Sequence, residues 1–151
     1  MTVVLSGFAD EISPDPRIQL ATLVSESISH LELRSAWSVN VADFSNSQVA
    51  AFRAATDDAG VRVSAIGSPI GKIPVAAPLA PELERMRRVA DVACELGTTI
   101  VRVFSFFIPA SEPAERHRDQ APSPFKRSRS LPSGGGWRRR PGRTTSPRQC
   151  R

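Results

Sequence analysis

Short apolar segments rich in β-branched residues recur along the chain, and they constrain its fold more than any other feature. They begin near residues 3, 30, 61 and 100, and a helical pattern follows each of the first three. Because strand–helix–strand units join parallel strands through right-handed crossovers, this order predicts an α/β fold with a parallel sheet. Periodicity alone leaves two architectures open: a doubly wound open sheet, or about four βα units of a (β/α)8 barrel.

Local signals set the expected boundaries of these elements. We expect strands over residues 2–6, 29–37, 61–66 and 99–104. Each helix has a start signal, and the last two end at a glycine. The signals are Asp15 with Pro16, then Ser45 with Gln48 and Gly60, then Pro81 and Gly97. The side chains expected to face the core are Leu20, Leu23 and Val24, then Val49, Phe52 and Ala59, then Leu83, Met86, Ala90 and Ala93.

The second expected strand has two faces of different character. Leu31 and Leu33 alternate with His30, Glu32 and Arg34, so one face is apolar and the other is charged. A parallel strand buried on both faces would instead be apolar almost throughout. The pattern therefore predicts helices on one side of the sheet and the wall of a polar cavity on the other.

The charge of the chain is divided unevenly along its length. Residues 1–120 hold 11 Lys and Arg against 15 Asp and Glu, whereas residues 121–151 hold nine Lys and Arg and no acid. That last segment has few large hydrophobic side chains, so it lacks the apolar surface needed to offset the entropy of ordering. We expect residues 1–119 to form one domain and residues 120–151 to form a disordered tail rich in Arg, Pro and Gly.

Two interpretations of the tail are open. Its basic clusters and Trp137 suit an arm that binds nucleic acid. Alternatively, an excess of Arg, Pro, Gly and Ser without acid is what a GC-rich gene yields when it is translated in a shifted frame. The second interpretation is favoured, because the tail begins where a fourth helix should continue.

Membrane and secretion signals are not found in the sequence. It has no run of 18 apolar residues and no basic N-terminal region followed by a long apolar stretch. We therefore expect a cytoplasmic protein without a membrane partner.

Four short motifs at the expected strand ends narrow the choice of architecture. They are GFADE at 7–11, HLELR at 30–34, SAIGSPIGK at 64–72 and VRVFS at 101–105. Together they resemble the xylose-isomerase-like TIM-barrel superfamily, and within it the sugar phosphate isomerase/epimerase branch. The resemblance covers residues 2–119, the N-terminal half of such a barrel. It favours a partial (β/α)8 barrel over the doubly wound sheet.

The resemblance implies a metal-dependent aldose–ketose isomerisation or epimerisation. In the family a divalent metal is held by Glu, Asp and His ligands from the later strands, and carboxylates move protons beside the polarised carbonyl. Those later strands have no counterpart in this sequence. We therefore expect a truncated isomerase-like protein that is inactive alone, with no well-bound metal, and we assign no catalytic residue.

The half of the barrel that the resemblance covers is the part that would hold a sugar or sugar phosphate. The substrate-binding residues that the resemblance implies are Glu11, Arg34, Trp37, Ser68, Lys72 and Arg102. Arg and Lys suit phosphate oxygens, and an aromatic ring such as Phe104 suits a sugar face. Other interpretations stay open: Glu32, Arg34 and Arg102 as a mutually paired barrel interior, Trp37 as a packing residue, and Lys72 as plain surface.

Two other classes of function remain as alternatives. The basic tail suits a nucleic-acid-binding protein, and a doubly wound sheet would suit a small ligand-binding domain.

Four strands that do not close a ring would leave unpaired sheet edges. We therefore also expect self-association through those edges.

Overall fold

A computed structural model describes residues 3–117 as a parallel four-stranded sheet with three α-helices. The strands lie in the order of the sequence, as β1 (Ser6–Gly7), β2 (His30–Leu33), β5 (Arg62–Gly67) and β6 (Val101–Arg102). A separate antiparallel pair is made by β3 (Ser35–Ala36) and β4 (Val39–Asn40). The predicted α/β fold with a parallel sheet is confirmed.

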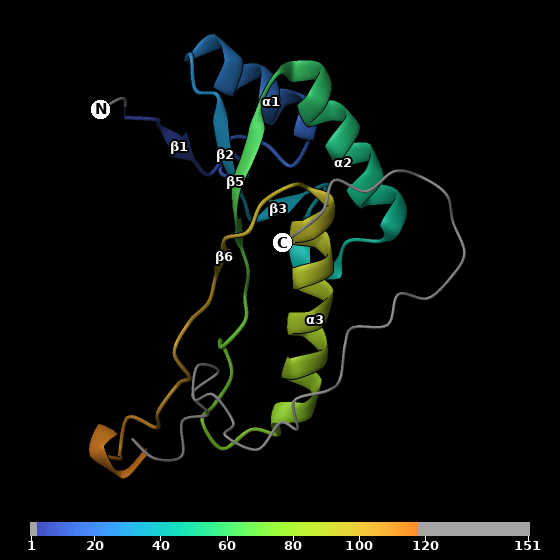
Figure 1. Cartoon of the computed structure of the whole chain (residues 1–151). Coiled ribbons are helices and arrows are strands. Elements are labelled where there is room, and N and C mark those ends of the chain that lie inside the picture. The colour runs from blue at the N-terminus through green and yellow to red at the C-terminus, as the bar shows by residue number, and fades with distance from the viewer. Residues whose placement is uncertain (1–2, 118–151) are drawn as a thin grey trace.

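The three helices lie together on one face of the sheet (Figure 1). Their bounds are Pro16–Ser25 for α1, Asn46–Ala59 for α2 and Leu79–Glu95 for α3, with short 3-10 turns at Val41–Asp43 (η1) and Ala114–His117 (η2). A doubly wound sheet has helices on both faces and a reversal of strand order. Residues 3–117 show neither feature.

The predicted helix signals are largely confirmed. The Asp15 side chain accepts a hydrogen bond from the backbone N–H of Arg17, and Pro16 is the first residue of α1. Ser45 and Gln48 form the reciprocal capping box of α2, and Gly60 ends that helix at φ +66°. These local contacts satisfy N–H and C=O groups that have no partner inside the helix.

The start and the buried face of α3 differ from the prediction. The helix begins at Leu79, so Pro81 is its third residue; a proline fits there because first-turn N–H groups need no intrahelical partner. Leu83 and Ala90 are exposed, whereas Glu82, Val89, Val92 and Ala93 are buried. Two of the four predicted core residues are confirmed, since Ala93 is buried and Met86 packs partly buried against the core, whereas Glu82 takes an inner position next to the exposed Leu83.

The edge strand β1 is shorter than expected. The predicted strand over 2–6 is reduced to Ser6 and Gly7, and residue 2 lies outside the described residues. Val3, Val4 and Leu5 are 81%, 56% and 67% exposed. The prediction of a strand at these three residues is therefore wrong: they lie outside β1, and no element in residues 3–117 covers them.

The core lies between the sheet and the helices. Leu31 and Leu33 are buried on the helix side and pack with Phe52, Ile66 and Val89, whereas Glu32 and Arg34 are only half-buried. The predicted two-faced character of β2 is confirmed. In α1, Val24 is half-exposed, and Gln19 is the buried residue instead.

The predicted tail over 120–151 lies outside the described residues. Within residues 3–117, no helix is both long and apolar enough to cross a lipid bilayer.

Candidate functional site

Cations and aromatic rings alternate along the carboxyl-terminal ends of the parallel strands. The Arg34 guanidinium lies 4.8 Å from the centre of the Phe8 ring, and that of Arg102 lies 5.1 Å from the same ring. Arg102 also lies 5.0 Å from the Phe104 ring, whose other neighbour is the Lys72 ammonium at 4.4 Å. We call Arg34, Phe8, Arg102, Phe104 and Lys72 the cation–aromatic ladder. All four distances are within cation–π range.

Asp10 connects one end of the ladder to the loop after β1. Its Oδ2 atom accepts hydrogen bonds from Arg34 Nε at 2.7 Å and from Ser35 Oγ at 2.8 Å. Arg34 also donates through its second terminal nitrogen to Glu11 Oε1 at 2.8 Å. The Asp10 side chain is 12% exposed and that of Glu11 is 70% exposed, so only Glu11 is open to solvent.

Burial and hydrogen bonding have opposite effects on the pKa of Asp10, which forms an ion pair with Arg34. Burial raises the pKa of Asp10, but hydrogen bonds from Arg34 and Ser35 and the charge of Arg34 outweigh it, so its pKa lies below the ordinary value of 3.8. Hydrogen bonds to Asp10 and Glu11 raise the pKa of Arg34 above its ordinary value. Both groups are therefore charged at neutral pH.

A second carboxylate lies beside Arg102. Glu32 Oε1 is 3.4 Å from a terminal nitrogen of Arg102, an ion pair longer than a hydrogen bond of good geometry. Gly67 at the end of β5 lies against both side chains: a Cβ there would be 3.2 Å from Arg102 and 3.4 Å from Glu32. A glycine at this position leaves room for the guanidinium to lie across the strand end. We call the ladder together with Asp10, Glu11 and Glu32 the polar wall.

The polar wall does not satisfy all of its own hydrogen-bonding groups. Oδ1 of Asp10, Oε1 of Glu32 and Nε of Arg102 are buried without a hydrogen-bond partner. Such groups are costly, at about 1–3 kcal/mol each. Two of the three atoms are acceptors and one is a donor. A hydroxyl group, which both donates and accepts, complements that combination.

Lys72 is held in place by the loop between β5 and α3. Glu82 Oε1 accepts a 2.6 Å hydrogen bond from Gly71 N, and Phe104 N donates to Ile70 O at 2.7 Å. Gly71 has a φ of +85°, and a Cβ there would lie 2.0 Å from the Phe104 carbonyl oxygen. Only glycine allows this close approach of two backbone segments. The loop thereby places the Lys72 ammonium over the Phe104 ring.

The remaining predicted site residues lie in different surroundings. Ser68 is fully buried; its hydroxyl donates to the Arg102 carbonyl at 2.6 Å and accepts from Ile70 N at 3.3 Å. It therefore positions the β6 backbone. Trp37 packs against Phe44 and Phe52, with ring centres 5.6 and 6.0 Å away. The structure therefore brings together Glu11, Arg34, Lys72 and Arg102, but it does not bring Ser68 or Trp37 onto the ladder.

The position of Trp37 follows from a tight turn between β3 and β4. Trp37 and Ser38 have φ values of +54° and +59° and connect β3 to β4 as a two-residue hairpin loop. Positive φ at both loop residues is the type I′ pattern that suits the twist of a hairpin. Neither residue is the Gly or Asn that usually marks such a turn, so the sequence lacks the usual signal.

Phe8 and Asp10 are part of the polar wall, yet they were not among the predicted site residues. Ala9 between them is buried in the core, so the alternation of β1 continues past its last paired residue. That alternation, 6, 8 and 10 on one face with 7 and 9 on the other, is the signal that could have identified both.

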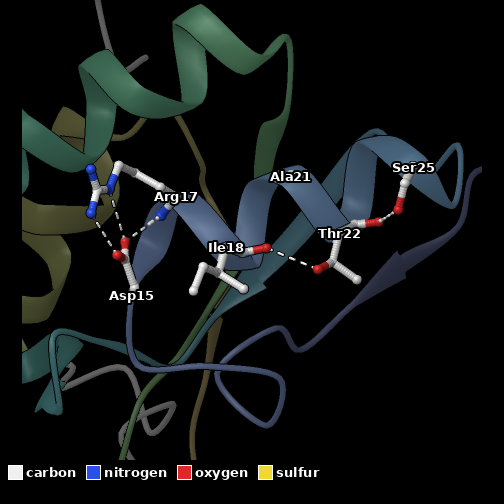
Figure 2. A pocket seen from close by; sticks show the side chains of 6 residues that line it. All are labelled: Asp15, Arg17, Ile18, Ala21, Thr22 and Ser25. Atoms are coloured by element: carbon white, nitrogen blue, oxygen red, sulfur yellow. Dashed lines mark hydrogen bonds and ion pairs between the residues drawn. The ribbon is translucent and has the colours of Figure 1, made fainter.

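One surface hollow lies apart from the polar wall. A depression of about 540 Å³ lies along the outer side of α1 (Figure 2). Its polar groups are paired with one another: Arg17 with Asp15, and the hydroxyls of Thr22 and Ser25 with backbone carbonyls one turn earlier. None of the predicted site residues lines it, and we assign it no binding role.

The metal implied by the resemblance was tested against the residues present. In the described part of the chain, no three His, Cys, Asp or Glu side chains are placed so that they could hold a metal ion. Residues 3–117 therefore do not provide the set of ligands that the implied metal would need. Comparison with known proteins gave no matching family model and no match among curated proteins.

Proposed function

We propose that residues 3–117 are the N-terminal part of a (β/α)8 barrel of the xylose-isomerase-like kind, and that the polar wall binds a sugar or sugar phosphate. Isomerase or epimerase activity belongs to the complete barrel. The role of this part of the chain is to hold the substrate.

The arrangement of the elements supports the barrel part of this proposal. The strands are parallel and sequential, and the helices cover one face, as in consecutive βα units of a barrel. The charged groups lie on the other face and at the carboxyl ends of the strands, which is where barrel enzymes bind their substrates.

The observation that most supports an anionic ligand is that the cations of Arg102 and Lys72 contact the same aromatic ring. Both cations contact Phe104, and Lys72 forms no ion pair with an acid of residues 3–117. The two groups would bind phosphate oxygens, Arg102 through its planar fork and Lys72 as a point charge. The exposed carboxylate of Glu11 would accept hydrogen bonds from sugar hydroxyls.

Calorimetric titration of the full chain tests this proposal. The titrants are fructose 6-phosphate, fructose and inorganic phosphate. The test variant is Arg102→Gln. The matched control is Arg87→Gln, which removes the same charge from the exposed face of α3. We expect fructose 6-phosphate to bind most tightly. Arg102→Gln should weaken it about 10- to 100-fold, since hydrogen bonds to charged groups contribute about 1.5–3 kcal/mol. Arg87→Gln should change it less than twofold.

The proposal fails if none of the three compounds binds to the full chain. It also fails if Arg102→Gln and Arg87→Gln have equal effects, because binding would then depend on net charge alone. Preference for inorganic phosphate over the sugar phosphate would remove the sugar part of the proposal.

A further inference from the structure

The two outer strands of the sheet each have only one neighbour in the part of the chain that the structure describes. β1 pairs with β2, and β6 pairs with β5. One edge of each outer strand therefore presents unpaired N–H and C=O groups. Such edges favour pairing with another strand.

Apolar side chains are exposed next to both edges. Val3, Val4 and Leu5 are 81%, 56% and 67% exposed beside β1, and Ile100 and Val103 are 60% and 36% exposed beside β6. Leu5 and Val103 share their strand alternation with Ala9 and Val101, which face the helices. Val4 and Ile100 alternate with these residues and share the parity of the polar wall, so exposed apolar side chains flank both edges, and nothing in residues 3–117 covers them.

We propose that a second copy of this chain covers both edges, with β1 of each copy pairing with β6 of the other around a two-fold axis. The two edges are opposite sides of one parallel sheet, so this contact keeps all strands parallel. If four strands span half a ring, the head-to-tail contact closes after two copies and gives eight strands, with no free edge. This inference rests on the barrel arrangement in the proposed function.

The exposed apolar area is sufficient for such a dimer. If the five side chains of one copy together lose most of their exposed surface, roughly 500 Å², two copies bury about 1,000 Å² of apolar surface, near the lower limit for a specific interface. Backbone pairing at two seams adds to this area. The candidate site also becomes enclosed, because the polar wall of one copy then faces that of its partner across the ring.

Sedimentation velocity of the full chain measures the assembly directly. We expect a dimer at micromolar concentration that dissociates on dilution. Leu5→Lys and Val103→Glu each place a charge in both seams of a homodimer, so each variant should dimerise at least about tenfold more weakly. Ile18→Lys is the matched control: Ile18 is half-exposed on α1, in the surface hollow and outside β1 and β6 (Figure 2).

Mixing the two edge variants identifies which strands meet. A heterodimer of Leu5→Lys with Val103→Glu has one unaltered seam and one seam in which the new Lys and Glu oppose each other. The mixture should therefore recover most of the dimer that each variant loses alone. Circular dichroism of each variant checks that it is folded.

Four results would overturn the proposal. A monomeric wild-type chain up to about 100 μM would mean that the edges are covered within one molecule or remain open. Open-ended oligomers would mean that the contact does not close. Dimerisation by each edge variant alone, or no recovery on mixing, would exclude β1–β6 pairing. None of these depends on sugar binding, so a failure here is separable from failure of the titration with Arg102→Gln.

Discussion

Arg34 Nε donates a 2.7 Å hydrogen bond to Asp10 Oδ2, and this ion pair joins the end of β2 to the loop after β1. The two residues are 24 positions apart in the sequence. Both are mostly shielded from solvent, since their side chains are 32% and 12% exposed. The pair therefore links the ladder to the rest of the fold.

Asp10→Asn should make the chain less stable at neutral pH and less sensitive to acid. The pKa of Asp10 is below 3.8 in the folded state, so its ionised form stabilises the fold above pH 3.8, and this contribution is lost as the pH falls through the lower folded value. We expect a loss of about 1–3 kcal/mol at pH 7 and a smaller loss at acidic pH, as Asp10 becomes protonated in the folded chain. Urea unfolding at several pH values measures this. Asp58→Asn, an exposed site on α2, is the control; equal pH dependence in wild type and Asp10→Asn would contradict the prediction.

Gly71→Ala should destabilise the chain more than Gly60→Ala. Both glycines have positive φ, but a Cβ at Gly60 meets nothing within 4 Å, whereas at Gly71 it would lie 2.0 Å from a backbone oxygen. Gly60→Ala should cost about 1–2 kcal/mol from the left-handed conformation alone. Gly71→Ala should exceed this, because two backbone segments must move apart. Thermal unfolding of the two variants compares them, and equal losses would show that the contact with Phe104 is unimportant.

Glu82→Gln should be tolerated, whereas Glu82→Leu should not. The buried Glu82 side chain accepts a hydrogen bond from Gly71 N, and an amide oxygen can replace the carboxylate in this role. Leucine would leave the N–H unpaired, at a cost of about 1–3 kcal/mol. Chemical denaturation gives the difference, and hydrogen exchange at Gly71 reports on the bond itself. Similar stability of the two variants would argue against this role for Glu82.

Ser38→Gly should stabilise the chain by about 0.5–1 kcal/mol, because Ser38 has a φ of +59°, which glycine adopts without steric cost. Ser38→Ala is the control: it removes the hydroxyl but retains the Cβ, so it should give no gain. The midpoint of thermal unfolding distinguishes the two. An equal gain from both variants would mean that the hydroxyl, and not the backbone conformation, is responsible.

The capping residues and the two-faced β2 strand could be predicted because they depend on local interactions. The Ser45–Gln48 capping box and the αL glycine at position 60 involve residues within a few positions of one another. The alternation of Leu31 and Leu33 with Glu32 similarly requires only the two-residue period of a strand.

The buried face of α3 depended on a contact that is distant in sequence. Leu83 and Ala90 are apolar enough for the core, yet Glu82 is buried because Gly71, 11 residues away, donates to it. Gln19 is buried in a similar way, since its amide donates to the carbonyls of Ser13 and Ser35. A hydrophobic pattern contains no information about such polar partners.

The sequence by itself determined the α/β class, the order of the strands and helices, the ends of α2, and the presence of Glu11, Arg34, Lys72 and Arg102 at strand ends. Only the tertiary structure decided which of these side chains meet. It placed Trp37 on Phe44 and Phe52, committed Ser68 to the β6 backbone, and brought Phe8 and Asp10 into the polar wall. The physical reason is that secondary structure depends on interactions between near neighbours, whereas these contacts depend on how parallel strands from distant parts of the chain are aligned in the sheet.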